Sequence, residues 1–223
     1  MVKFIKCTCA IFLYFLLQIN LILAQDESAD PIYYKLIVPK HSYSIDFALP
    51  VPIANKPFKG IMQGLVRFSG SYQYALKSNF SVGLGFNYTY FYINRFKITP
   101  QILGGMHLGN AYLKLAYEKY TTERVGYDVG VKIGYARNYF HSDSLQTPNI
   151  VQSTIVEPYA AFCLTASEKT AYKWMVSYSF LGFGFTPERI GDYVNQDYQL
   201  SEYKRVTRFL SFGFSYSHYF KQW

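Results

Sequence analysis

Residues 79–93, NFSVGLGFNYTYFYI, decide the fold. The even positions from Phe80 to Tyr92 are aromatic or aliphatic, whereas the odd positions from Ser81 to Thr89 are small or polar. This period of two predicts a β-strand with one apolar and one polar face. The run is longer than the usual globular strand of about five or six residues. Its length suits a tilted strand that crosses a membrane.

The same alternation recurs on both sides of this stretch. The other expected strands are residues 42–49, 64–76, 110–120, 125–135, 155–166, 171–183 and 207–220. With 79–93 they make about eight, an even number as in bacterial membrane barrels. Pro158 is expected near the start of its strand, where a missing hydrogen bond is tolerated. The predicted fold is all-β: a closed antiparallel up-and-down transmembrane barrel.

The lengths of the connections support this topology. The expected loops 50–64, 94–106, 138–153 and 185–205 are long, and 77–79, 120–124 and 166–170 are short. Outer-membrane barrels have short periplasmic turns and longer external loops, so both termini are expected in the periplasm. The loop 185–205 also holds tyrosines and charges of both signs, which suit a contact surface for an unknown partner.

The composition agrees with a barrel and not with a nucleic-acid-binding protein. Charged residues make up 16% of the chain and aromatic residues 20%. The mean hydropathy of −0.01 does not exclude a barrel, because outward and inward residues alternate and average out. The net charge is +8, but no basic run or stripe is present, so no nucleic-acid partner is expected.

The N-terminus predicts export. Lys3 and Lys6 precede an apolar stretch that ends near Ala24, which is the pattern of a secretory signal peptide. A membrane anchor is the alternative, although Gln18 and Asn20 interrupt the stretch. We therefore expect a signal peptide at 1–24, a periplasmic segment at 25–41 and the barrel at 42–223. Cys7 and Cys9 would leave with the signal, and a disulfide within the remaining chain would then be impossible.

Two stretches carry a family resemblance: FLSFGFSYSHYF at 209–220 and ALPVPIANKPFKGIMQGL at 48–65. The chain resembles the small eight-stranded outer-membrane β-barrel superfamily, most of all the barrel-domain proteins of Bacteroidetes-type bacteria. The resemblance implies an outer-membrane location and outer-membrane lipids as partners. It also implies that the barrel-assembly machinery reads a signal in the last strand, formed by Leu210, Phe212, Phe214, Tyr216 and Phe220.

The strand register places ionisable side chains inside the barrel: Asp46, Arg67, Lys114, Glu118, Asp128, Lys132, Glu157 and Lys173. Buried charges are costly unless they are paired, and equal numbers of acids and bases permit pairing. Lys132 is expected to pair with Asp128 or Glu157. The other inward residues are mostly Ser, Gly, Asn, Thr and Ala. Because an eight-stranded barrel is narrow, we expect a plug of side chains; an ion path or gate is the alternative.

No residue pattern predicts catalysis, a metal site or a cofactor. His41, His107, His141 and His218 are far apart in sequence, so three of them are not expected to share a metal. His141, Ser142 and Asp143 are types used by hydrolases, but adjacency does not place them in a catalytic geometry. We expect a non-enzymatic envelope protein whose external loops bind partners or support envelope integrity. An outer-leaflet lipid-modifying enzyme and a narrow channel are the alternatives.

Overall fold

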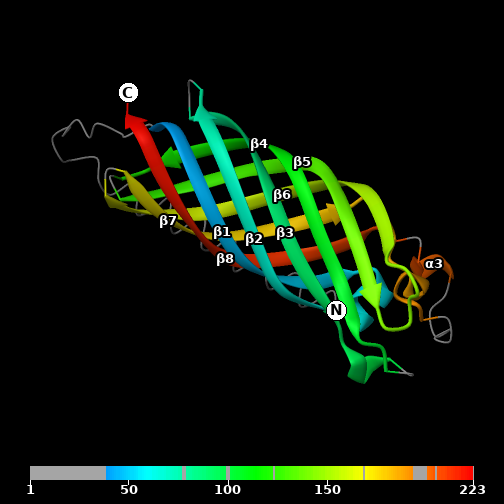
Figure 1. The fold of residues 1–223 in the computed structure, drawn as a ribbon. Coiled ribbons are helices and arrows are strands. Elements are labelled where there is room, and N and C mark those ends of the chain that lie inside the picture. Colours follow the sequence, from blue (N-terminus) through cyan, green and yellow to red (C-terminus); the bar gives the residue numbers. More distant parts are fainter. Residues whose placement is uncertain are drawn as a thin grey trace. The chain divides into compact units, whose positions relative to one another are not determined.

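The computed structural model describes residues 39–76, 79–98, 101–122, 124–167, 169–192, 200–203 and 205–222. Eight antiparallel strands form a closed barrel in which sequence neighbours pair and β8 pairs with β1 (Figure 1). The elements are β1 (Pro39–Ala54), α2 (Lys56–Ile61), β2 (Met62–Ala75), β3 (Phe80–Ile93), η1 (Arg95–Lys97), β4 (Gly104–Tyr120), β5 (Val125–Ser142), β6 (Asn149–Ser167), β7 (Thr170–Leu181), η2 (Pro187–Ile190), α3 (Leu200–Tyr203) and β8 (Thr207–Gln222). The predicted fold is confirmed. The expected signal peptide lies outside the described residues.

Alternation in the strands separates a polar inner face from an apolar outer face. On β3, Ser81 and Asn87 are buried inside, whereas Leu84 and Phe86 are 63% and 56% exposed on the outside. Large apolar side chains are exposed on the outer face of all eight strands. This is the reverse of a soluble protein and is the arrangement that lipid surroundings require. Within the described part of the chain, no helix is long and apolar enough to cross a bilayer.

Two of the expected long loops are mostly strand. β1 continues to Ala54 and β2 begins at Met62, so the connection between them is shorter than 50–64 and consists largely of α2. Likewise β5 reaches Ser142 and β6 begins at Asn149, so only residues 143–148 remain of the expected loop 138–153. The strands continue because backbone pairing persists there, for example between Tyr139 and Ile150. The barrel wall therefore extends further on the loop side than predicted.

Pro158 lies in the middle of β6, so its expected place near a strand start was wrong. The β5–β6 ladder is continuous through the pair Val131–Pro158. The β6–β7 ladder instead passes from Val156–Phe180 to Tyr159–Ser177 without a pair at residue 158. Proline has no backbone N–H, so it can occupy this position only where the ladder on one side does without that donor.

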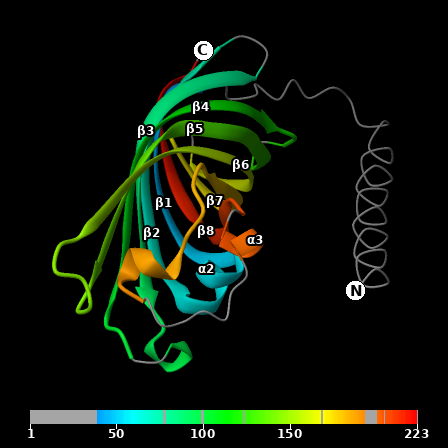
Figure 2. The same ribbon diagram turned by 90° about the vertical axis from the view of Figure 1, so that its right-hand side faces the viewer.

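A hydrophobic core closes the loop side of the barrel. It combines inward residues of the strands with α2 and η2: Phe58, Ile61, Met62, Phe91, Ile93, Ile98, Ile102, Met106, Leu108, Ala136, Phe140, Ile155, Leu181, Phe183, Phe185, Ile190 and Phe209. Figure 2 shows α2 and α3 at the same end of the barrel, where Lys56 and Glu202 form a salt bridge of 3.1 Å. The expectation of mostly small and polar inward residues was therefore wrong at this end.

Asn55 fixes α2 in this core. Its side-chain oxygen accepts from the Phe58 backbone N–H at 3.0 Å and caps the helix. Its side-chain nitrogen donates to the carbonyl oxygens of Phe185 and Arg205 at 3.1 and 2.9 Å. Asparagine also tolerates the positive φ of 68° found here. The Phe58 ring then lies 5.1 Å from Phe91 and 5.6 Å from Phe185, between centroids.

Candidate functional site

Below the hydrophobic core, the lumen is charged. The structure places all the inward charges named from the sequence inside the barrel, each at most 8% exposed: Asp46, Arg67, Lys114, Glu118, Asp128, Lys132, Glu157 and Lys173. They are contributed by β1, β2, β4, β5, β6 and β7. Four acids and four bases give no net formal charge. The ion pairs divide them into two groups, each with two acids and two bases.

The first group, here called the Arg67 cluster, consists of Arg67, Glu157, Lys132 and Asp46. Arg67 Nη2 lies 2.5 Å from Glu157 Oε1. Lys132 Nζ lies 3.3 Å from Asp46 Oδ2 and 3.7 Å from Glu157 Oε1. Glu157 was one of the two partners expected for Lys132. The other expected partner, Asp128, was wrong, and Asp46 from β1 occupies its place.

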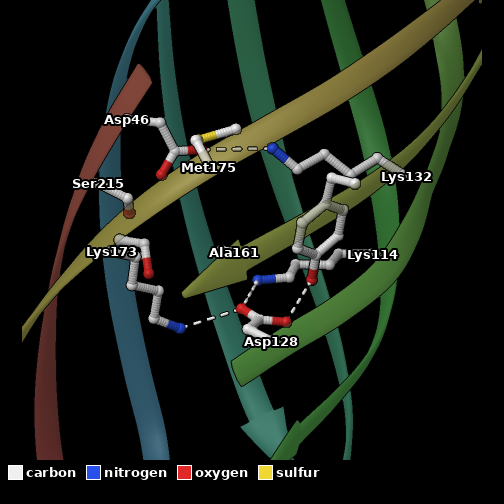
Figure 3. Close-up of a pocket in the computed structure, with 10 residues that line it drawn as sticks. Asp46, Lys114, Asp128, Lys132, Ala161, Lys173, Met175 and Ser215 are labelled. Carbon is white, nitrogen blue, oxygen red and sulfur yellow. Dashed lines mark hydrogen bonds and ion pairs between the residues drawn. The ribbon is translucent and has the colours of Figure 1, made fainter. Parts of the chain in front are cut away.

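The second group, the Lys173 cluster, consists of Lys173, Lys114, Asp128 and Glu118. Asp128 Oδ2 lies 3.0 Å from Lys173 Nζ and 3.3 Å from Lys114 Nζ. Lys173 Nζ also lies 3.0 Å from Glu118 Oε1. Figure 3 shows both lysines directed at Asp128, while Lys132 is directed at Asp46. Asp128 is thus shared by two cations, which explains why Lys132 needs a different acid.

Hydroxyl and amide groups complete the hydrogen bonding of the acids. Ser179 donates to Glu157 at 2.7 Å and Tyr159 donates to Asp128 at 2.7 Å. Glu118 accepts from several donors, namely Gln73 at 2.7 Å and the hydroxyls of Tyr120 and Tyr219 at 2.9 Å each. Arg67 donates in addition to Ser177 at 3.0 Å and Ser211 at 3.2 Å. Buried ion pairs are tolerated only with such additional partners.

Two inward tyrosines, Tyr112 and Tyr159, were not anticipated from the sequence. Lys132 Nζ lies 5.1 Å from the centroid of the Tyr112 ring and 5.3 Å from that of Tyr159, and Lys114 Nζ lies 5.0 Å from the Tyr159 ring. Cation–π attraction therefore adds to the ion pairs. Their parity was a usable signal, because Tyr112 lies two residues before the inward Lys114 and Tyr159 two after Glu157.

Glycine at two inward positions makes room for these rings. A Cβ at Gly85 would lie 2.7 Å from the Tyr112 hydroxyl oxygen, and one at Gly130 would lie 2.9 Å from Cε1 of Tyr159. Both distances are shorter than side chains tolerate. The carbonyl oxygens of Gly70 and Leu115 would lie closer still, at 2.5 and 2.3 Å, so the neighbouring strand also excludes a side chain at both positions.

Little free space remains between the clusters. A cavity of about 20 Å³ is lined by residues that include Asp46, Lys114, Asp128, Lys132 and Lys173 (Figure 3). This volume holds about one or two water molecules. The cavity lies between the two clusters and is lined by residues of both. The charged lumen is consequently filled by its own side chains.

The residue types that suggested catalysis do not assemble a catalytic site. Ser142 Oγ donates to the Ile190 carbonyl at 2.6 Å, and Asp143 Oδ1 accepts from the Leu103 N–H at 3.1 Å. His141 instead lies beside His107, with ring centroids 4.9 Å apart. Among the described residues, no group of three or more His, Cys, Asp or Glu side chains is arranged to hold a metal ion.

The closed barrel, the apolar outer face and the paired charges inside define a class of protein. A closed sheet satisfies every backbone hydrogen bond without water, which a membrane-spanning chain needs. The outer face carries exposed aromatic residues on most of the strands, including Phe80 on β3, Tyr127 on β5 and Trp174 on β7. The protein is a transmembrane β-barrel of the small outer-membrane type.

Comparison with solved structures agrees with this class. The barrel is similar to Neisserial surface protein A (NspA), with a TM-score of 0.54 and 12% identity over 81% of this chain and 97% of that one. It is also similar to the outer membrane protein OprG from Pseudomonas aeruginosa, with a TM-score of 0.50 and 10% identity over 83% and 98%. At these identities the likeness shows the fold alone. No protein-family model and no curated protein sequence matches the chain.

Proposed function

We propose that this chain is a non-enzymatic integral protein of a Gram-negative-type outer membrane, with a lumen closed by its own side chains. The barrel anchors external loops, which bind partners or support the integrity of the envelope. The proposal rests on the observation that side chains of two kinds fill the inside of the barrel. The two neutral charge clusters fill the lumen, and the hydrophobic core around Phe58 fills its loop side.

Exposed loop residues support the part of the proposal that concerns partners. Phe96, in η1 between β3 and β4, is 79% exposed. Arg95 lies over its ring, with the guanidinium carbon 5.1 Å from the centroid, and Lys97 follows. An exposed aromatic ring flanked by cations contributes nothing to the barrel core. Such a group is suited to contact another molecule.

The same proposal includes the biogenesis of the barrel and its relationship to Bacteroidetes-type barrel-domain proteins. The residues expected to form the assembly signal lie on the outer face of β8: Leu210, Phe212, Phe214, Tyr216 and Phe220. An outward apolar row is accessible to an assembly machinery during insertion. We propose that this row is the signal that directs the chain into the outer membrane.

Planar-bilayer recording tests whether the lumen is closed. Purified protein that shows the heat-modifiable folded band on gels is inserted into the bilayer, with a general porin as the positive control. We expect no sustained current steps from the parent protein. Stable single-channel currents whose ion selectivity changes in Lys132→Met would contradict the closed lumen and support the channel alternative.

A further inference from the structure

The outer face of β5 marks where the membrane ends on the loop side. It reads Tyr127, Val129, Val131, Ile133 and Tyr135, followed by Arg137, Tyr139 and His141. The two tyrosines that bracket the aliphatic residues are eight positions apart, about 26 Å along the strand. With the tilt of a membrane strand this is about 20 Å of membrane depth, close to the apolar band of about 25 Å in such barrels. Arg137 therefore lies at the level of lipid head groups.

Charge on the outer wall is sparse and of one sign. Among the outward strand positions whose side chains the structure describes, the charged residues are Lys119, Arg137 and Arg208. The guanidinium of Arg208 lies over the Phe180 ring at 5.3 Å. Arg137 is exposed and has no hydrogen-bond or ion-pair partner within the described residues. An unpaired cation at this depth is suited to an anionic group from the surroundings.

A notch in the outer surface of the barrel lies directly beside Arg137. Gly109 on β4 pairs with Arg137 on β5 and with Tyr88 on β3. A Cβ built at Gly109 would meet no atom within 4 Å, so the surface there is open. On the side of the notch towards the bilayer centre, the outward residues of β4 are Ala111, Leu113 and Leu115.

Two further residues near the notch, Tyr88 on β3 and His107 on β4, carry polar groups. The Tyr88 hydroxyl and His107 Nδ1 are 2.6 Å apart, and the His107 ring lies 5.9 Å from that of Tyr139. When the tyrosine donates to Nδ1, the ring proton of His107 is on Nε2 and is free to donate. Arg137 and His107 thus offer donors beside this open site, Tyr88 fixes the tautomer of His107, and no acidic side chain lies on the described outer strand face.

We propose that this notch binds the phosphate-bearing head group of a lipid in the leaflet at the loop end of the barrel. The Arg137 guanidinium binds the phosphate in the two-pronged manner that arginine favours, and the Nε2–H of His107 supplies a further hydrogen-bond donor. One acyl chain lies over Gly109 and along Ala111 and Leu113. This inference rests on the proposed membrane location and adds the chemical class of a ligand to it.

Native mass spectrometry of the folded barrel in detergent tests the site. The probes are phosphatidic acid, which has a phosphate monoester, and diacylglycerol, which has the same chains without phosphate. We expect Arg137→Gln to weaken phosphatidic acid binding roughly tenfold or more, as for the loss of charge-assisted hydrogen bonds. The matched control Lys119→Gln removes one outward cation from the other end of the barrel and should change binding less than about twofold.

Gly109→Leu tests the notch without changing the charge. The open space at Gly109 accommodates the new side chain, so the barrel should fold, while the bound lipid is displaced. Equal losses in Arg137→Gln and Lys119→Gln, or full binding by Gly109→Leu, would overturn the site. Displacement of the lipid by equimolar inorganic phosphate would show an anion site in place of a lipid site and overturn it equally. A parent without a heat-modifiable folded band in lipid contradicts the membrane location instead; a folded parent that does not prefer phosphatidic acid contradicts only the lipid site.

Discussion

Replacing Asp128 by asparagine removes the charge that holds two lysines of the Lys173 cluster. Asp128 Oδ2 lies 3.0 Å from Lys173 Nζ and 3.3 Å from Lys114 Nζ, and Oδ1 accepts from Tyr159 at 2.7 Å. Asparagine has nearly the same shape, so packing is preserved and the electrostatic effect is isolated. Lys173 then keeps Glu118 as its acid, Lys114 loses the acid it was paired with, and the cluster carries one uncompensated positive charge.

Breaking a buried ion pair by removing one partner costs about 3–5 kcal/mol. Asp128 pairs with two cations, which raises the cost, while water in the cavity of about 20 Å³ lowers it. We expect the free energy of unfolding to fall by about 3 kcal/mol. Asp143→Asn is the matched control, because Asp143 is exposed and its carboxylate accepts one backbone N–H. That change should cost about 1 kcal/mol or less.

Second substitutions separate local from overall neutrality. Adding Lys114→Met to Asp128→Asn leaves Lys173 with Glu118, so part of the lost stability should return. Adding Lys132→Met also restores overall neutrality, but it leaves Asp46 and Glu157 with Arg67 alone in the other cluster. This double variant should be no more stable than Asp128→Asn.

Urea unfolding in lipid vesicles, followed by the heat-modifiable band, measures the parent, the three variants and the control. Equal rescue by Lys114→Met and Lys132→Met would show that the two clusters do not act separately. A cost for Asp128→Asn no larger than that of Asp143→Asn would refute the reasoning altogether.

Three further predictions concern other parts of the barrel. A cysteine at Asp143 should react with an impermeant maleimide on intact cells and one at Thr122 should not; the reverse result would invert the orientation. Leu84→Arg places a charge on the lipid face and should cost about 2–4 kcal/mol if it lies near the bilayer centre. Leu103→Arg, at an exposed residue between strands, is its control, and equal costs would argue against lipid at Leu84. Phe58→Ala should lower the free energy of unfolding by about 3–5 kcal/mol, measured by urea with retained β-sheet circular dichroism; an unchanged urea midpoint would mean that Phe58 does not support the fold.

Side-chain parity was sufficient to name the charges inside the barrel, because a strand residue can face only inward or outward. The partner Glu157 of Lys132 also follows from local register, since the two residues are directly opposite on β5 and β6. Asp46 does not follow from it, because β1 and β5 are not neighbours in the sheet. Contacts across the lumen depend on the stagger of the whole barrel and on side-chain length, and neither can be obtained from one strand pair.

The loop side of the barrel shows a second limit of predicting structure from the period-two alternation alone. Alternation continues along β5 past Asn138, but the inward residue changes from amide to Phe140, which joins the hydrophobic core. The period is the same for a polar and an apolar lumen. The chemical type of the inward residues, which the alternation does not constrain, decides whether a segment fills the barrel with charges or with a core.

Along the barrel, the inward side chains change from paired charges to a hydrophobic core, and this change has a single physical explanation. At membrane depth the outside is hydrocarbon, so apolar residues gain nothing by turning inward, and the narrow lumen is filled with paired polar groups. Beyond the membrane the outside is water, and burying apolar residues inside becomes favourable again. On β5 the outward residue changes from Tyr135 to Arg137, and the inward residue changes from Asn138 to Phe140. Both faces of β5 therefore indicate that the membrane surface lies near residues 135–140. The notch at Gly109, which pairs with Arg137, lies at the same level.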